Sequence, residues 1–208
     1  MLQQFQCRLL CANPLVAVAD GFLSADSCEG IIDLARNRLR RSEVGTDEAA
    51  LEVSEDRTNS DCSLDPRLEP DVASLMQKFA DLLALPATHG EGLSVLHYAT
   101  AQEFKPHADG IWSGANPDAV AEFKADGGQR LFTAMVYLNE VEAGGGTTFP
   151  KLGITVDPMP GRLLIFANTP AGDDDASVRA IHAGEPVTAG EKWAAVSWWR
   201  QRPFPMSA

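Results

Sequence analysis

The sequence is poor in positive charge. Only 17 of its 208 residues are lysine or arginine, against 29 aspartates and glutamates, so the formal net charge is -12. A surface with this balance repels phosphate backbones and anionic lipid headgroups. We therefore expect neither nucleic acid nor a membrane as a partner, and the charge also disfavours demethylation of nucleic acid.

Cysteine and long apolar runs are scarce as well. The four cysteines form no repeated CxxC pair and no zinc-finger spacing with histidine, so we expect free thiols. No apolar run approaches the roughly 18 residues that a membrane-spanning helix needs. The N-terminal segment lacks the small-residue cleavage site typical of a secretory signal, so a cytoplasmic location is the default expectation.

What remains is an ordinary globular composition, with 45% hydrophobic and 22% charged residues. The length suits a single domain, which we place at residues 1–208. Within it, residues 1–91 are expected to form an N-terminal helical support region, and residues 92–202 the core.

Two amphipathic helices are predicted in the support region. Ser24 can cap a helix whose apolar positions recur at helical spacing, namely Cys28, Ile31, Ile32, Ala35 and Leu39. A second helix is expected from residue 66, with one apolar face that continues to Leu83. Residues 43–65 between them are polar and acidic, and we interpret them as a loop that can include one strand.

From residue 92 onward, short runs of β-branched and aromatic residues alternate with glycine, proline and aspartate turns. The expected strands are 93–99, 131–139, 162–167, 180–182 and 192–200. No helix of useful length is expected among them, which favours an antiparallel sandwich or small barrel over alternating strands and helices. The predicted fold is mainly β with flanking α: a double-stranded β-helix (jelly roll, cupin-like) buttressed by the N-terminal helices.

The stretch FKPHADG places two metal-ligand types, His107 and Asp109, two positions apart. Residues i and i+2 of a strand point to the same face, so both side chains can reach one ion. A lone HxD also fits a capped turn or a surface pair. Of the other histidines, His89 is expected at the surface and His97 on the outer face of a strand, which leaves His182 as the candidate third ligand.

Two histidines and one carboxylate form the facial triad of non-haem Fe(II) oxygenases. On the last predicted strand, Lys192 shares one face with Ala194, Val196, Trp198 and Arg200. A lysine that faces the interior is costly unless an anion neutralises it, and a dicarboxylate co-substrate would do so. The alternative is a lysine at the mouth of the strand that extends to solvent.

Four ordered motifs carry a resemblance to a known family: YATAQEFKPHAD at 98–109, RLFTAMVYLN at 130–139, GGGTTFP at 144–150 and HAGEPVTAGEKW at 182–193. Together with NPLVAVADGFLSADSCEGIIDLA and SEDRTNS upstream, the sequence resembles the prolyl 4-hydroxylases of the 2-oxoglutarate and Fe(II)-dependent dioxygenase superfamily. The resemblance extends over residues 13–200.

The resemblance implies roles for individual residues. The iron ligands are His107, Asp109 and His182. The 2-oxoglutarate pocket is formed by Lys192, which pairs with the far carboxylate, and by Tyr98, Thr133 and Trp198. Substrate-groove positions are Arg57, Phe104 and Arg200. Phe104 stands where the family often has tyrosine, a change that affects peptide specificity more than iron chemistry.

The function that follows is hydroxylation of a prolyl residue in a peptide or protein, with Fe(II), 2-oxoglutarate and O2, and with release of succinate and CO2. Ascorbate is a candidate reductant. Two alternatives stay open: a hydroxylase of a free, proline-like amino acid, and a non-catalytic metal-binding jelly-roll module. A peptide substrate would need an open groove, for which residues 43–65 and 110–128 are the expected walls, whereas a free amino acid would need a closed pocket.

Overall fold

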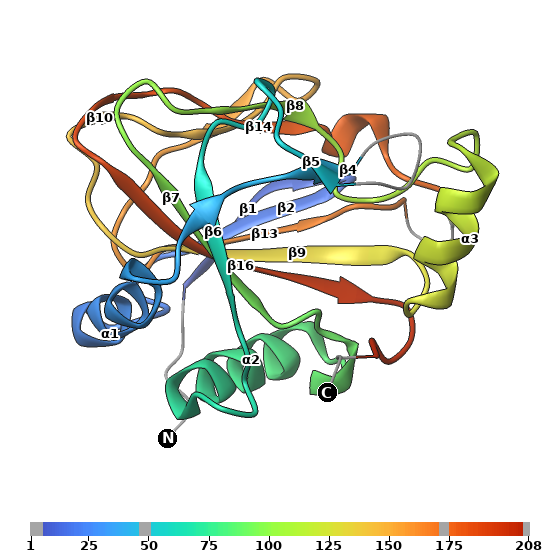
Figure 1. Cartoon of the computed structure of the whole chain (residues 1–208), viewed down its shortest axis with the longest axis horizontal. Helices are drawn as coiled ribbons and strands as arrows, with labels where there is room; N and C mark the ends of the chain where they lie inside the picture. The colour runs from blue at the N-terminus through green and yellow to red at the C-terminus, as the bar shows by residue number, and fades with distance from the viewer. Residues whose placement is uncertain (1–5, 46–50, 171–174, 206–208) are drawn as a thin grey trace.

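Two antiparallel sheets form the body of the protein (Figure 1). The coordinates are a computed structural model, which describes residues 6–45, 51–170 and 175–205. The larger sheet has eight strands in the order β1 (Cys7–Ala12), β2 (Leu15–Ala19), β13 (Leu163–Ala167), β9 (Arg130–Tyr137), β16 (Lys192–Arg200), β7 (Leu93–Tyr98), β6 (Ser60–Leu64) and β3 (Arg40–Arg41).

The smaller sheet has four strands in the order β12 (Ile154–Val156), β11 (Thr147–Phe149), β14 (His182–Gly184) and β8 (Phe104–His107). Two short pairs complete the strands of the described residues: β10 (Ala143–Gly144) with β15 (Val187–Ala189), and β4 (Val44–Gly45) with β5 (Leu51–Glu52). All strand pairs of the described residues are antiparallel, and the predicted mainly β jelly roll is confirmed.

Alternating side chains of the larger sheet enter two separate cores. One core lies between the larger sheet and the helices, and on β16 it receives Trp193, Ala195 and Trp199. Ala194 and Val196 pack into the other core, which lies between the two sheets and contains Phe149 of β11. This alternation follows from the pleat of a strand, and it places the Lys192 side of β16 toward the smaller sheet.

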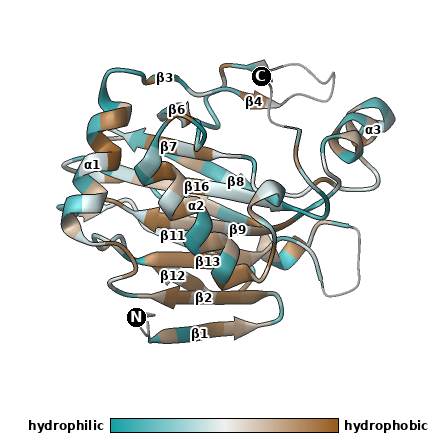
Figure 2. Cartoon of the chain, turned by 90° about the horizontal axis from the view of Figure 1, so that it is seen from below, coloured by the Kyte–Doolittle hydropathy of each residue, from teal (hydrophilic) through white to brown (hydrophobic). Residues whose placement is uncertain are grey.

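Helices α1 (Ala25–Arg36) and α2 (Pro70–Leu83) lie on the same side of the larger sheet, away from the smaller one (Figures 1 and 2). Helix α1 is confirmed together with its cap, since the Ser24 hydroxyl accepts a hydrogen bond from the Ser27 amide at 3.2 Å, but it ends at Arg36, so Leu39 lies outside it. Its apolar face, which includes Ile31 and Ala35, is fully buried.

The predicted start of the second helix was wrong by four residues. Helix α2 begins at Pro70, because Asp65 ties the preceding turn: its carboxylate accepts a hydrogen bond from the Arg67 amide at 2.8 Å. Leu68, which a start at residue 66 would place within the helix, is therefore outside it and 76% exposed.

Helix α3 (Pro117–Ala125) contradicts the expectation of no useful helix after residue 92. Asn116 caps it by accepting from the Asp118 amide at 2.9 Å, and Pro117 occupies its first turn. None of its residues is buried, so it has no apolar face for a periodicity search to detect. Short 3-10 turns at η1 (Ala87–His89) and η2 (Val178–Ala180) complete the helical elements of the described chain.

The N-terminal region is less helical than predicted, because β1, β2, β3 and β6 of the larger sheet belong to it. Of the predicted strands, 192–200 is reproduced residue for residue as β16. The predicted strand 180–182 is displaced, since η2 ends at Ala180 and β14 begins at His182. Within the described segments, no helix has the length and apolar character needed to cross a bilayer. All four cysteines are free thiols, as predicted.

Candidate active site

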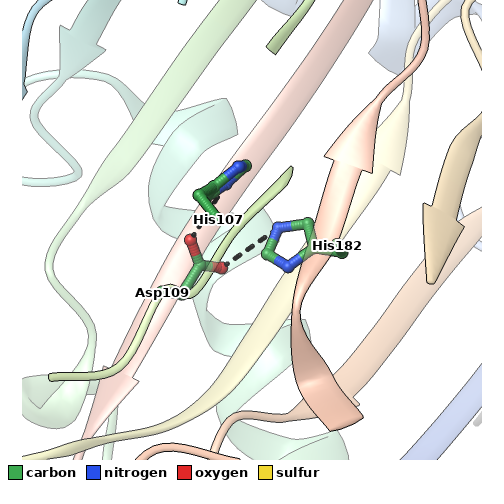
Figure 3. A group of neighbouring side chains, drawn as sticks. All are labelled: His107, Asp109 and His182. Carbon is green, nitrogen blue, oxygen red and sulfur yellow. Dashed lines mark ion pairs between the residues drawn. The ribbon is translucent and has the colours of Figure 1, made fainter. Parts of the chain in front are cut away.

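Three candidate metal ligands meet between the two sheets (Figure 3). His107 ends β8, Asp109 follows it by two residues, and His182 begins β14. The antiparallel pairing of β14 with β8 sets His182 directly opposite His107. One ligand atom from each of the three residues lies within 4.8 Å of the others, and Asp109 is between the two imidazoles: Oδ1 is 3.6 Å from His107 Nε2 and Oδ2 is 3.7 Å from His182 Nε2.

The surroundings keep His107 and Asp109 in the protonation states that a metal requires. Burial, followed by the neighbouring His182, lowers the pKa of His107 to about 3, so its imidazole is neutral at physiological pH. Burial alone would raise the pKa of Asp109, but the two histidines, Arg130 and a hydrogen bond from Thr133 together hold it below its ordinary value. The His107 nitrogen and the Asp109 carboxylate are therefore available to the same ion.

Asp109 is held at both its side chain and its backbone. The Thr133 hydroxyl donates to Asp109 Oδ2 at 2.6 Å, and Arg130 Nη1 donates to the Asp109 carbonyl at 3.2 Å. Each imidazole is also oriented through its Nδ1, which lies 2.8 Å from the Lys105 carbonyl for His107 and 3.2 Å from the Ala180 carbonyl for His182. Contacts of this kind fix the direction of metal ligands.

A narrow pocket extends from the three ligands between the sheets, and it contains all four residues expected to hold the co-substrate: Tyr98, Thr133, Lys192 and Trp198. Lys192 is only 2% exposed. Among the described residues its ammonium has no hydrogen bond or ion pair, and it stands 5.0 Å from the centre of the Tyr98 ring and 5.4 Å from that of Tyr137. Burial lowers the pKa of Lys192 to about 7, and Glu185 opposes the shift.

The other two histidines lie outside this site. His97 projects from the opposite face of β7 to Tyr98, where its Nε2 is 2.8 Å from a carboxylate oxygen of Glu191. His89 belongs to η1, and its Nδ1 is 2.9 Å from the Arg200 carbonyl. Neither histidine belongs to the ligand cluster found in the described part of the chain.

An open groove of about 830 Å³ passes over the ligands. Its floor includes His107 and Asp109, and Arg57, Phe104 and Trp198 line both the groove and the narrow pocket. The Phe104 ring stacks on the His107 imidazole with 3.5 Å between ring centres. The groove is also lined by residues 43, 44, 56, 57 and 61 and by β8.

Arg57 and Phe104 thus lie where the resemblance puts substrate-groove residues. Arg57 is fixed by an ion pair with Asp61 at 2.6 Å and by donation to the Glu43 carbonyl at 2.9 Å. Its guanidinium carbon lies 5.0 Å from the centre of the Phe104 ring. Residues 110–128, the other expected wall, are not among those that line the groove.

Arg200 lies elsewhere. The pairing of β16 with β9 shifts register between Trp199 and Arg200, and Arg200 lines neither the groove nor the narrow pocket. It is 4% exposed and is bound by the Glu91 carboxylate and by the Gly128 carbonyl at 2.8 Å. The simple alternation that placed Arg200 on the Lys192 face ends at this shift.

A second arginine, Arg130, lines the groove together with Arg57, and it was not among the predicted site residues. Its guanidinium forms two 2.6 Å hydrogen bonds with Glu91, and its central carbon lies 4.2 Å from the centre of the Trp198 ring. It is the first residue of the motif RLFTAMVYLN, directly before the predicted strand 131–139, but nothing local indicated Glu91 as its partner.

Comparisons with known proteins agree with this geometry. Residues 93–200 match the family model of the 2OG-Fe(II) oxygenase superfamily. Probable prolyl 4-hydroxylase 7 of Arabidopsis thaliana is 33% identical over 92% of this chain and 64% of its own length, and probable prolyl 4-hydroxylase 3 of the same plant is 33% identical over 92% and 71%. The crystal structure of the viral collagen prolyl hydroxylase of Paramecium Bursaria Chlorella virus-1, in its 2-oxoglutarate complex, superposes with a TM-score of 0.70 at 26% identity, over 91% of this chain and 97% of that one.

The fold and the ligand cluster define a 2-oxoglutarate and Fe(II)-dependent oxygenase. Within that superfamily, the chain belongs to the prolyl 4-hydroxylase family. The metal of the family is Fe(II), its co-substrate is 2-oxoglutarate and its oxidant is O2.

The residues present suit these groups. His107, Asp109 and His182 supply the nitrogen and oxygen donors of a facial triad, which leaves iron positions for other ligands. The buried ammonium of Lys192, unpaired in the described residues, is the counter-charge for a carboxylate at the far end of the pocket. The donor set and this orphaned cation together match one metal and one dicarboxylate.

Proposed function

We propose that the protein hydroxylates prolyl residues within a peptide or protein chain. The observation that carries this proposal is the connection between the narrow pocket and the open groove, which meet at His107, Asp109 and Trp198. The pocket suits a small dicarboxylate, and the groove is open along the surface as a chain passing through it requires. The three similar proteins described above are named as prolyl hydroxylases, which supports the choice of proline.

The chain's own residues bind and orient the reactants. Lys192 would pair with the far carboxylate of 2-oxoglutarate, and the Tyr98 ring would pack against the lysine and the co-substrate. Burial raises the pKa of Tyr98, so its hydroxyl stays protonated and can donate a hydrogen bond. Phe104, Arg57 and Trp198 would position the substrate at the boundary of groove and pocket.

Bound Fe(II), with 2-oxoglutarate and O2, supplies the oxidation: one oxygen atom is inserted into a C–H bond of the substrate, and the other enters succinate as CO2 is released. The protein excludes water from this chemistry, because Asp109 and His182 are each 8% exposed and the pocket behind them is walled by apolar residues of both sheets.

A free amino acid is the second candidate substrate, and the open groove argues against it, since a small zwitterion needs a closed pocket with partners for both charged ends. A purely structural metal module is disfavoured by Lys192, for which such a module has no use. A cytoplasmic location and a role for ascorbate as reductant stay predictions.

The test is an anaerobic reconstitution with Fe(II) and 2-oxoglutarate, followed by exposure to air with proline-containing peptides or with free proline. We expect succinate in equal amount to a peptide product heavier by about 16 Da on proline. The Asp109→Ala variant is the negative control, because it lacks the anionic ligand. Product on free proline alone would reject the peptide assignment, and succinate with a mass increase on another residue would reject the prolyl one.

A further inference from the structure

A chain of buried polar side chains runs from the end of β13 to the metal site. Asn168 directly follows β13 and is 2% exposed, and its Nδ2 donates to the Thr133 hydroxyl at 2.9 Å. Thr133, also 2% exposed, donates in turn to Asp109 Oδ2 at 2.6 Å. Pairing of β13 with β9 sets Phe166 opposite Thr133. The backbone N–H of Asn168 continues the ladder by donating to the Leu131 carbonyl at 2.8 Å.

The direction of both hydrogen bonds follows from the number of protons available. An ionised carboxylate can only accept, so an oxygen–oxygen distance of 2.6 Å between Thr133 and Asp109 requires the single hydroxyl proton to lie between them. The hydroxyl then has only lone pairs to offer to Asn168. A carbonyl oxygen at that place would face a lone pair, so the amide must present its NH2 group, which fixes its orientation.

We propose that Asn168 is a positioning residue for the metal ligand Asp109 and acts through Thr133. Its NH2 group holds the Thr133 hydroxyl in the one rotational state that points its proton at Asp109 Oδ2. With Oδ2 engaged, Oδ1, which accepts no hydrogen bond from the described residues, is the oxygen directed to the metal. The inference rests on the assignment of Asp109 as a metal ligand and is independent of which substrate is hydroxylated.

The local energetics favour a role in the site over a role in folding. Asn168 Oδ1 is buried and has no hydrogen-bond partner in the described structure. The free-energy cost of leaving such a group without a partner is comparable to or larger than the gain from the one hydrogen bond that the side chain donates. An asparagine with this balance does little for the stability of the fold, whereas partners of metal ligands commonly change metal affinity by about 10–100-fold.

The experiment measures binding of Co(II), a redox-stable stand-in for Fe(II), by anaerobic titration calorimetry of the full chain. Asn168→Ala should weaken Co(II) binding about tenfold and Thr133→Val by about 10–100-fold. Thr133→Ser, which keeps the hydroxyl, should stay within a few-fold of the wild type. Ser197→Ala is the matched control, since this fully buried hydroxyl of β16 also lacks a partner in the described residues but lies next to Ala134, on the opposite face of the sheet to Thr133.

The deciding measurement is the double variant. If Asn168 acts only through Thr133, Thr133→Val with Asn168→Ala should bind Co(II) no more weakly than Thr133→Val alone. Losses that multiply would show that Asn168 acts by another route and would overturn the proposal, as would wild-type Co(II) affinity in Asn168→Ala. Asn168→Ser provides a second measurement if the alanine variant does not fold, with the same non-additive outcome expected.

Discussion

Lys192 lies directly opposite Tyr98 in the pairing of β16 with β7, and its buried ammonium stands 5.0 Å from the centre of the tyrosine ring. Tyr98 is the last residue of β7 and Lys192 is the first residue of β16, 94 positions later in the chain. Both residues line the narrow pocket. A cation kept in this place without an ion-pair partner among the described residues costs folding energy, and the expected return is affinity for a dianion.

Replacement of Lys192 by methionine should therefore have opposite effects on binding and stability. Lys192→Met keeps the volume but removes the charge, so the dissociation constant for 2-oxoglutarate should rise by about 30-fold or more, while the free energy of unfolding without ligands should rise by about 1 kcal/mol or more. Titration calorimetry and urea unfolding measure the two quantities. Lys78→Met, on the exposed side of α2, is the control; equal 2-oxoglutarate affinity in both variants would contradict the assignment.

The pH dependence of 2-oxoglutarate binding should follow the same lysine. Its pKa is lowered to about 7 in the free protein, so the site is charged below pH 7 and loses its charge above it. The co-substrate binds the charged form, hence affinity should be level below pH 7 and fall by up to tenfold per pH unit above it. Calorimetry at pH 8 in buffers of different ionisation enthalpy should detect proton uptake. Lys192→Arg should lose this dependence, because its guanidinium stays charged; an unchanged affinity of the wild type from pH 6 to 9 would rule out the lysine.

Substitution of Arg57 should affect the peptide and spare the co-substrate. Arg57→Ala removes the guanidinium that lies over Phe104 and anchors the groove wall through Asp61, so we expect the KM for peptide to rise by about 5- to 30-fold and the KM for 2-oxoglutarate to stay within about twofold. Steady-state succinate assays with each substrate varied separate the two constants. Arg67→Ala, at an exposed arginine outside the groove, should change neither constant. An equal rise in both for Arg57→Ala would indicate a general loss of structure instead.

We expect Arg200 to stabilise the fold and to take no part in peptide binding. Arg200→Met breaks a buried ion pair with Glu91 and the donation to the Gly128 carbonyl, so the free energy of unfolding should fall by about 3 kcal/mol. Arg130 keeps its own bonds to Glu91, and the peptide KM should change by less than about threefold. Urea unfolding and succinate assays test this pair of outcomes. A large rise in peptide KM at unchanged stability would show instead that Arg200 contributes to peptide binding.

The sequence predicted those parts of the molecule that depend on local pattern. Helix α1 has a cap and a buried face within twelve residues, so its start was predicted correctly, and β16 alternates from Lys192 to Trp199, so its bounds were predicted correctly. The strands of the smaller sheet have three or four residues each and exist through pairing with distant partners, as β14 does with β8. Segments so short carry no periodicity of their own.

The site divides in the same way. His107 and Asp109 were visible as a spaced pair, and the fold brings His182 opposite them. Arg130 and Asn168 were missed because their partners, Glu91 and Thr133, lie 39 and 35 positions away and no local spacing relates them. Arg200 was misplaced because a register shift in one strand pair cannot be read from the letters of either strand.

The two faces of β16 allow the pocket and the core beneath the helices to be varied largely separately. Residues 192, 194, 196 and 198 line the reaction chamber, while residues 193, 195 and 199 are packed beneath the helices. A library that varies only the first set should change which molecules are accepted, and it should also affect stability through Ala194 and Val196, which pack between the sheets. A library that varies only the second set should change thermal stability first. Deletion of a single residue within β16 would move the side chains on one side of the deletion to the opposite face of the sheet. Such a deletion should therefore lower stability and activity far more than any single substitution in the strand.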